Sequence, residues 1–295
     1  MAKRADQPKK RIQAKKSVRG RRLWLPALLL ALPMALLGWM YFSARLVHLC
    51  PAQVYLQDLP AAFDGAQLLY VSDFNIESAA EARQSAALLQ RLSDLAPDLL
   101  ILGGDYVSLE DAQQAQPFYD ALAAFSVPLG KFAVAGEADS KNAALESALA
   151  NAGVALLSDR CASVTRDGAQ LVIAGLSDVS RKLTPYAELG SAFSGDECVL
   201  AVAHNPAAYV GVRVSEARNG GAWADLVLAG HNLGGQIRLF GRTLHTLPPE
   251  EARCFAGWYY EGDLPMLVSQ GLNVPGLPLR LGSRAEVWLI TLYRA

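Results

Sequence analysis

The sequence of 295 residues has little cysteine, little histidine and almost no net charge. Its four cysteines, Cys50, Cys161, Cys198 and Cys254, show no CxxC pair or zinc-ribbon spacing, which excludes a cysteine-based zinc knuckle. A disulfide is permitted outside the cytoplasm, but the sequence selects no pairing. The formal net charge is -1, so no domain-wide positive field is available to attract nucleic-acid phosphates. We therefore predict no nucleic-acid partner.

The positive charge that is present is concentrated at the N-terminus. Residues 1–22 hold ten Lys and Arg against the single acid Asp6, which is a basic tail. Residues 23–43 (LWLPALLLALPMALLGWMYFS) contain no charged residue and are about long enough to cross a bilayer core. The pattern predicts one transmembrane helix with a cytoplasmic N-terminus, because a basic flank stays inside. Everything after Arg45 is then expected to be extracytoplasmic.

Two other readings of this N-terminal region stay open. A cleaved signal peptide is the first, although the apolar run exceeds the usual length and no clear small-x-small cleavage site follows it. The second concerns export, because Arg21-Arg22 loosely resembles a twin-arginine signal as well as a generic basic flank. Residues 44–64 contain Pro51 and Pro60 without a sustained period, so we predict a juxtamembrane stalk there and one domain over residues 65–295.

Within residues 65–295, short β-branched or Leu-rich runs alternate with Ala-rich stretches, which predicts an α/β fold. The predicted strands are Gln67–Ser72, Asp98–Leu102, Lys131–Ala135, Gln170–Ala174, Val199–Ala203, Asp225–Ala229, Met266–Ser269 and Val287–Leu292. The predicted helices are Ala79–Leu95 after the cap Ser78, Asp111–Phe125 with Pro117 opening its regular part, and Asn142–Ala150, capped by Asp139 or Ser140 and ending before Gly153.

Several predicted strands end on a residue that can bind a metal, beside a glycine or a proline. These residues are Asp73, Asn75, Asp105, Glu137, His204 and His231. They are expected to converge, because ligands bind in the crevice at the carboxyl ends of the strands of an α/β sheet. Carboxylate and amide oxygens mixed with imidazole nitrogens suit Mn, Fe or Zn. The sequence therefore predicts a site for a divalent metal.

The motifs VSDFN, LGGDYVS, AGEAD, AHNP and GHNLGGQIRLFG, followed by LVSQGLNVPGLPLRLGSRAEVWLITL, occur in an order that resembles the calcineurin-like metallophosphoesterases. The resemblance runs from about Gly65 to the C-terminus and is strongest with the small membrane-associated bacterial branch. It implies a sandwich of two mixed β-sheets flanked by helices. It also implies hydrolysis of phosphate monoesters or diesters, in which a metal-held hydroxide attacks phosphorus. Asp105, as the ligand that bridges two metals, and His231 are the catalytic residues that the resemblance implies.

The match to the family pattern is incomplete at three motifs. Where the family has Asp-x-His, this chain has Asp73-Phe74-Asn75, and where it has Gly-Asn-His and an acid, this chain has Gly136-Glu137-Ala138-Asp139. Where it has Gly-His-x-His, this chain has Gly230-His231-Asn232-Leu233. The resemblance then implies a first metal site of Asp73, Asp105 and the amide oxygen of Asn75, with one ligand lost at Leu233. It implies a second, complete site of Asp105, Glu137, His204 and His231.

These departures predict one tight metal ion, with the second in doubt. The histidine that the family uses to protonate the leaving group is Ala138 here, so we expect slow hydrolysis that favours good leaving groups. The alternatives are an inactive binding module of the cell envelope and a metal that only stabilises the fold. Without a cation, however, Asp73, Asp105 and Glu137 would crowd three carboxylates together at a cost of about 1.4 kcal/mol per pKa unit.

The expected partners follow from the predicted placement. The membrane is contacted through residues 23–43, and the substrate is a phosphate ester, with a lipid or an envelope glycan suggested by the anchor. Among other residues, His48 is expected at the membrane interface, and His245 is either a replacement acid or a surface residue. Gly234 to Gln236 form either a tight turn or a phosphate contact. Arg280 and Arg284 are expected to be solvated.

Overall fold

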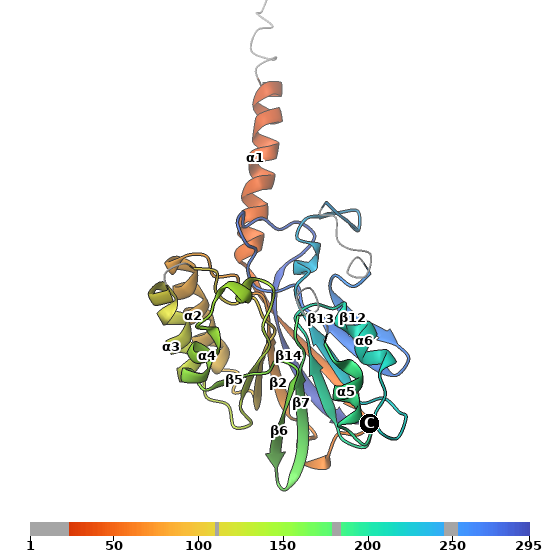
Figure 1. Cartoon of the computed structure of the whole chain (residues 1–295). Coiled ribbons are helices and arrows are strands. Elements are labelled where there is room, and N and C mark those ends of the chain that lie inside the picture. Colours follow the sequence, from red (N-terminus) through yellow and green to blue (C-terminus); the bar gives the residue numbers. More distant parts are fainter. Residues whose placement is uncertain (1–23, 110–111, 179–183, 245–252) are drawn as a thin grey trace, which may run out of the picture. The chain divides into compact units, whose positions relative to one another are not determined.

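The structure is a computed structural model that describes residues 24–109, 112–178, 184–244 and 253–295 (Figure 1). The chain divides into two compact units, Met1–Trp39 and Met40–Ala295. The predicted basic tail, Leu23 of the predicted span and His245 lie outside the described residues.

The first described element is the helix α1 (Trp24–Arg45), which agrees with the uninterrupted apolar run in the sequence. Its residues Ala27–Arg45 are long and apolar enough to cross a membrane. Large side chains on it are exposed, including Leu29 at 72% and Phe42 at 70%. An apolar helix with exposed leucines is typical of a segment that lies in lipid, and its orientation stays a prediction.

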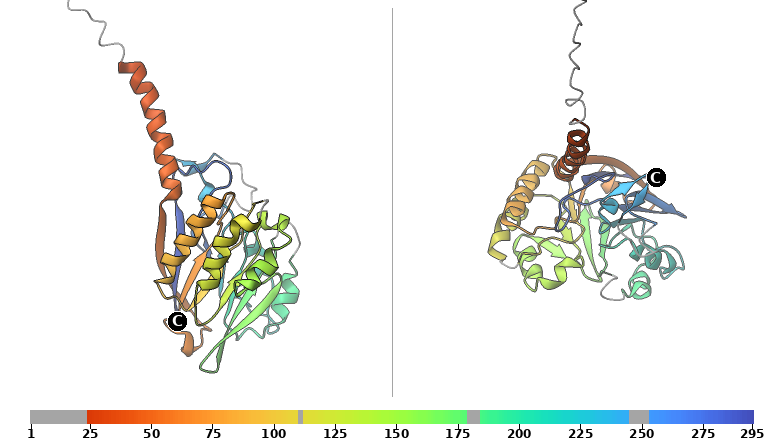
Figure 2. Two further views of the ribbon diagram at one scale, coloured as in Figure 1. Left: turned by 90° about the vertical axis from the view of Figure 1, so that its left-hand side faces the viewer. Right: turned by 90° about the horizontal axis from the view of Figure 1, so that it is seen from above.

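Residues 40–295 contain, within the described part of the chain, two six-stranded mixed sheets (Figures 1 and 2). The first sheet has the order β1 (Val47–Leu56), β14 (Ala285–Arg294), β2 (Gln67–Val71), β3 (Leu99–Leu102), β4 (Lys131–Ala133), β5 (Val154–Leu156). The second has the order β12 (Gly257–Glu261), β13 (Leu264–Val268), β9 (Leu226–Ala229), β8 (Val199–Val202), β7 (Ala169–Gly175), β6 (Arg160–Arg166). In each sheet four neighbouring strands are parallel, namely β2 to β5 and β7, β8, β9 and β13.

The two sheets pack face to face because successive side chains of each strand point to opposite faces. In β2, Leu68 and Tyr70 enter the core between the sheets, whereas Leu69 and Val71 enter a second core beneath the helices. The helices over the first sheet are α2 (Ala79–Ser93), α3 (Gln116–Ala124) and α4 (Leu145–Asn151), and those over the second are α5 (Tyr186–Ser191) and α6 (Ala208–Val214). This is the predicted sandwich of two mixed sheets flanked by helices.

The helix signals in the sequence are partly confirmed. The Ser78 hydroxyl accepts a hydrogen bond from the Glu81 amide at 3.3 Å, which caps α2 as predicted, and Pro117 lies in the first turn of α3. The predicted cap of α4 is wrong, because α4 follows Ala144 and no side chain caps it. Short 3-10 turns fill the connections: η2 (Ala61–Phe63), η3 (Ala112–Ala115), η4 (Ala138–Lys141) and η5 (Leu233–Gly235), and a small hairpin joins β10 (Arg238–Leu239) to β11 (Arg242–Thr243).

The prediction of an irregular connector over residues 44–64 is wrong, because this segment contains β1. This strand pairs in parallel with β14 over its whole length, from Val47 opposite Ala285 to Leu56 opposite Arg294. It lies at the edge of the first sheet, which is where a strand tolerates Pro51. Its partner lies more than 200 residues further along the chain, so no local pattern indicates the pairing. The domain boundaries themselves stay predictions.

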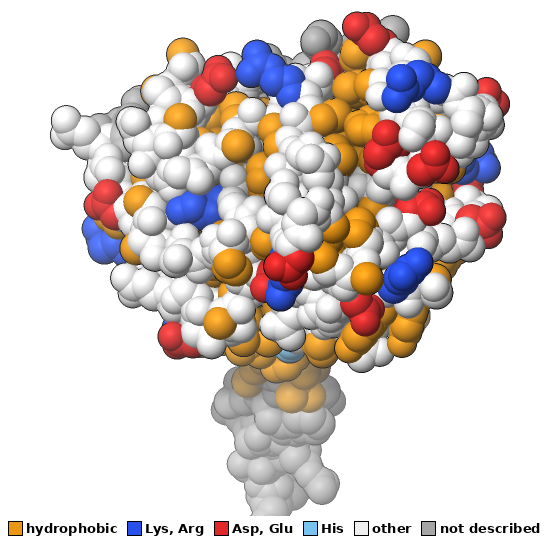
Figure 3. Space-filling model, turned by 90° about the horizontal axis from the view of Figure 1, so that it is seen from below, with side chains coloured by type: hydrophobic (Ala, Val, Ile, Leu, Met, Phe, Trp, Pro, Cys, Tyr) orange, Lys and Arg blue, Asp and Glu red, His pale blue; other side chains and the backbone are white. Residues whose placement is uncertain are grey.

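On one face of the molecule, acidic, basic and hydrophobic side chains are interspersed (Figure 3). Residues 23–295 nevertheless hold 17 Lys and Arg against 27 Asp and Glu, so the near-zero net charge of the whole chain arises because the basic residues 1–22 offset an acidic remainder.

Candidate metal centre

The predicted site residues follow strands at their carboxyl ends. Asp73 follows β2, Asp105 follows β3, Glu137 follows β4, His204 follows β8 and His231 follows β9. The backbone there is strained, because Asp73, Asp105 and His231 have positive φ angles of 57°, 57° and 71°. Left-handed conformations of this kind cost about 1–3 kcal/mol each in non-glycine residues and cluster at functional sites. The backbone N–H of Asp73 donates to the Gly104 carbonyl at 3.0 Å, and this hydrogen bond helps to hold Asp73 in its left-handed conformation.

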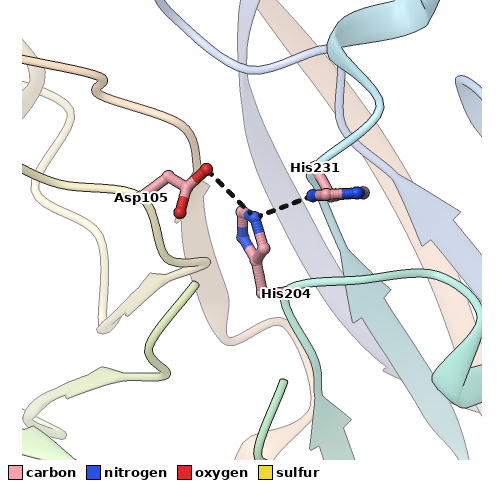
Figure 4. Close-up of side chains that lie close together, drawn as sticks. All are labelled: Asp105, His204 and His231. Atoms are coloured by element: carbon pink, nitrogen blue, oxygen red, sulfur yellow. Dashed lines mark hydrogen bonds and ion pairs between the residues drawn. The ribbon is translucent and has the colours of Figure 1, made fainter. Parts of the chain in front are cut away.

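Asp105, His204 and His231 form a compact group in which one ligand atom of each lies within 4.8 Å of the others (Figure 4). His204 Nε2 is 3.3 Å from Asp105 Oδ2 and 3.2 Å from His231 Nδ1. The other ring nitrogen of His204, Nδ1, lies 2.7 Å from the Gly103 carbonyl oxygen and can donate its proton there. That bond fixes the tautomer that leaves Nε2 available to a metal.

The geometry of this group fits a divalent metal. Ligands at about 2.1 Å from a tetrahedral ion are separated from one another by about 3.4 Å. The observed separations of 3.3 Å and 3.2 Å are close to that value. One carboxylate oxygen and two imidazole nitrogens also form a donor set that Zn, Mn or Fe accepts. The residues that the structure brings together therefore can hold one ion.

Electrostatics point to the same conclusion. His204 is fully buried, and burial lowers its pKa, but the carboxylates of Asp105 and Asp73 outweigh burial and raise the pKa to about 10. Burial raises the pKa of Asp105, but His204 outweighs it and the net pKa is lowered. The pKa of the fully buried Asp73 is raised, chiefly by burial. A bound cation would take the place of the His204 proton and neutralise the same carboxylates.

The other predicted ligands occupy different positions around this group. The Asp73 carboxylate accepts the His231 backbone N–H, at 3.1 Å to Oδ1 and 3.3 Å to Oδ2, so it positions His231. Asn75 is buried, and its Nδ2 donates to the Asn273 carbonyl at 3.4 Å. Glu137 is exposed at the start of η4. The roles of Asp73, Asn75 and Glu137 as ligands stay predictions.

Asp139 has a role that the sequence analysis missed. It is 3% exposed, and its carboxylate accepts the backbone N–H groups of Asp105, Tyr106 and Gly136, each at 2.8 Å. It therefore ties the loop after β3 to the loop after β4. Burial raises its pKa to about 6, against the opposing effect of the hydrogen bonds from Gly136 and Tyr106. In the sequence, the feature that could have indicated this role is an acid three residues after Gly136, which itself follows a predicted strand.

Arg280 was expected to be solvated, and that expectation is wrong. Its side chain is 0% exposed, and its guanidinium donates to the carbonyls of Leu233 at 3.0 Å and Gln270 at 2.8 Å. Burial lowers its pKa to about 10. Arg280 thus joins the loop after β9, which carries His231, to the loop after β13. A glycine in that second loop, Gly271, is required because a Cβ there would lie 2.5 Å from the Cβ of Asp73.

The chain is similar in sequence to proteins that are named as metallophosphoesterases or as a phosphodiesterase. The chain is 25% identical to the uncharacterized metallophosphoesterase YkuE of Bacillus subtilis over 259 residues, which is 85% of this chain and 87% of that protein. It is 30% identical to phosphodiesterase YaeI of Escherichia coli over 207 residues, 66% of this chain and 70% of that protein. It is 25% identical to the transmembrane protein with metallophosphoesterase domain of Bos taurus, over 82% of this chain but 56% of that protein.

No protein-family model matches the chain. Among solved structures, the NAD nucleotidase of Haemophilus influenzae aligns with a TM-score of 0.46 at 12% identity. The alignment covers 70% of this chain and 45% of the nucleotidase, so the chain spans less than half of that protein. This likeness is too weak to bear on activity.

Proposed function

Because the chain belongs to the calcineurin-like metallophosphoesterase family, we propose that it is a metal-dependent phosphoesterase that hydrolyses a phosphate monoester or diester. The observation that supports this most directly is the group formed by Asp105, His204 and His231, whose separations suit one divalent ion. Asp73, Asn75 and Glu137 would add ligands. We propose Mn, Fe or Zn as the metal, with one ion bound tightly.

The metal and two residues of the centre have separate tasks in this proposal. A divalent ion supplies Lewis-acid polarisation of a phosphoryl oxygen and lowers the pKa of a water. His204 presents Nε2 because the Gly103 carbonyl fixes its other nitrogen. Asp105 is held by the Ala138 N–H, which donates to its Oδ1 at 2.9 Å. Ala138 itself offers no proton to a leaving group, so the enzyme favours esters whose leaving group is stable as an anion.

The proposed location is the outer face of a membrane. Helix α1 is apolar and long enough to span it, and the basic residues before it favour a cytoplasmic N-terminus. The Bos taurus relative is itself named a transmembrane protein. An anchor keeps the domain close to the membrane, so the proposed substrate is carried by a lipid or by an envelope glycan.

The test is metal content and hydrolysis by the full-length protein purified in detergent. We expect about one equivalent of metal per chain and slow, metal-dependent hydrolysis of p-nitrophenyl phosphate. Both should be lost in His204→Ala/His231→Ala and kept in His48→Ala, which removes a histidine on β1 away from the centre. Metal that is absent from the wild type, or retained fully in the double variant, would contradict the proposed centre.

A second candidate function, an inactive binding module, is favoured by Ala138 and Leu233, which stand where the family has histidines. The two candidates differ in one measurable respect. Tight metal binding that raises the melting temperature without any turnover of activated phosphate esters would support the binding module.

A further inference from the structure

A groove begins beside the metal centre at Ala138. It has a volume of about 580 Å³ and runs between the segment 107–109 and the start of α4, over Tyr119 of α3. Helices α3 and α4 pack side by side there (Figure 1). The groove adjoins the centre, because the Ala138 N–H donates to Asp105 Oδ1 at 2.9 Å and Val107 lies two residues after Asp105.

The described residues that line the groove include no charged side chain. Its described walls consist mainly of small or aliphatic residues, such as Val107, Leu109 and Ala148. Its described polar members are Ser108, Tyr119 and Asn142, and none of them carries charge at neutral pH, since burial raises the pKa of Tyr119 to about 12. Among the described residues of the lining, therefore, no cation is available for a second phosphate group.

We propose that this groove binds the organic group of the phosphate ester, and that this group is uncharged and largely apolar, such as an alkyl or acyl chain. The inference rests on the proposed function, because it places the phosphate of the same molecule at Asp105, His204 and His231. The volume is in the range of sites that bury a small organic ligand. Ala138, which stands where the family has a histidine, presents only a methyl group to the groove that it lines.

The chemistry sets the size of the expected effect. An apolar group gains affinity for each methylene that it buries, and three additional methylenes strengthen binding by about 50-fold when all are buried. A nucleotide substrate would instead bring a sugar and further phosphate groups into the groove. For these groups the described lining offers hydroxyl and amide groups and no charge.

The experiment measures dissociation constants of methyl phosphate and butyl phosphate for the metal-loaded, full-length protein by isothermal titration. We expect butyl phosphate to bind about 50-fold more tightly than methyl phosphate. The groove is then blocked in two independent variants, Ala148→Phe and Ala144→Trp, both of which lie in its lining. The matched control is Ala150→Phe, an exposed position on the same helix outside the lining.

The preference for butyl phosphate should disappear in both blocked variants and persist in the control. Equal affinities of the wild type for the two phosphates, or an unchanged preference in the blocked variants, would overturn the inference. Hydrolysis of p-nitrophenyl phosphate, measured on the same preparations, separates this result from the fate of the proposed function. Turnover without any preference would overturn the groove alone, whereas absent metal and absent phosphate binding would overturn both.

Discussion

Replacement of Asp139 by Asn should weaken metal binding more than it weakens the fold. The carboxylate accepts three backbone N–H groups, and two of them, from Asp105 and Gly136, meet the same oxygen. Asn offers one oxygen and one NH₂ group. If the amide oxygen of Asn keeps the N–H groups of Asp105 and Gly136, the N–H of Tyr106 faces the NH₂ group, which is also a donor. Each buried donor left unsatisfied costs about 1–3 kcal/mol.

An opposing contribution reduces the loss of stability. Burial raises the pKa of Asp139 to about 6 from the ordinary value of 3.8, so its ionised form at pH 7 is disfavoured in the fold. A shift of about two units corresponds to about 3 kcal/mol, and the neutral amide removes that cost. The two contributions nearly cancel, and we expect a change in the free energy of unfolding within about 2 kcal/mol.

Metal affinity has no such compensation. Loss of a group that orients ligands commonly lowers metal affinity by about 10- to 100-fold, and Asp139 holds the backbone of Asp105. The assay pairs titration with the metal and urea unfolding of the metal-free protein, with Asp94→Asn at the exposed C-terminal cap of α2 as control. Wild-type metal affinity in Asp139→Asn, at any stability, would refute the reasoning.

Three further outcomes are expected. The pKa of His204, about 10 in the folded protein against about 6.5 when unfolded, gives the metal-free protein stability that is present below about pH 6.5 and lost as the pH rises through about 10; urea unfolding after chelation checks this, and an unchanged midpoint contradicts it. Arg280→Met leaves buried carbonyls without donors and should lower the free energy of unfolding by about 2–4 kcal/mol, measured by urea; a wild-type midpoint would count against that role. Leu233→His with Ala138→His should raise p-nitrophenyl phosphate hydrolysis by about 100-fold or more, and a folded double variant without gain would indicate a centre limited by more than its ligands.

Much of the fold was accessible from the sequence because its buried parallel strands are short apolar runs followed by chemically distinctive residues. Strands β2, β3, β8 and β9 were predicted close to their observed bounds, and each one precedes a residue of the candidate site. Local signals also sufficed for the start of α2 and for Pro117 in α3. Each of these elements is indicated by a pattern of a few neighbouring residues.

The features that the sequence did not predict depend on partners that are distant along the chain. Strand β1 pairs with β14, and Arg280 enters the core only because Leu233 and Gln270 present their carbonyls to it. Asp139 was interpreted as a local helix cap, but its partners Asp105 and Tyr106 lie more than 30 residues earlier in the chain. Polar groups whose partners are distant in sequence look like surface residues until tertiary structure supplies the partners.

The position of β1 has a consequence for the order of folding during synthesis. In the first sheet β14 lies between β1 and β2, so β1 has no partner until the residues of β14 have been made. Cys50 on β1 and Glu286 on β14 are separated by 236 residues, and a loop of that length closes slowly. Strand β1 therefore stays unpaired while almost all of the domain is synthesised. A nascent chain in this state has an open sheet edge, and it is during this interval that it most needs protection from association with other chains.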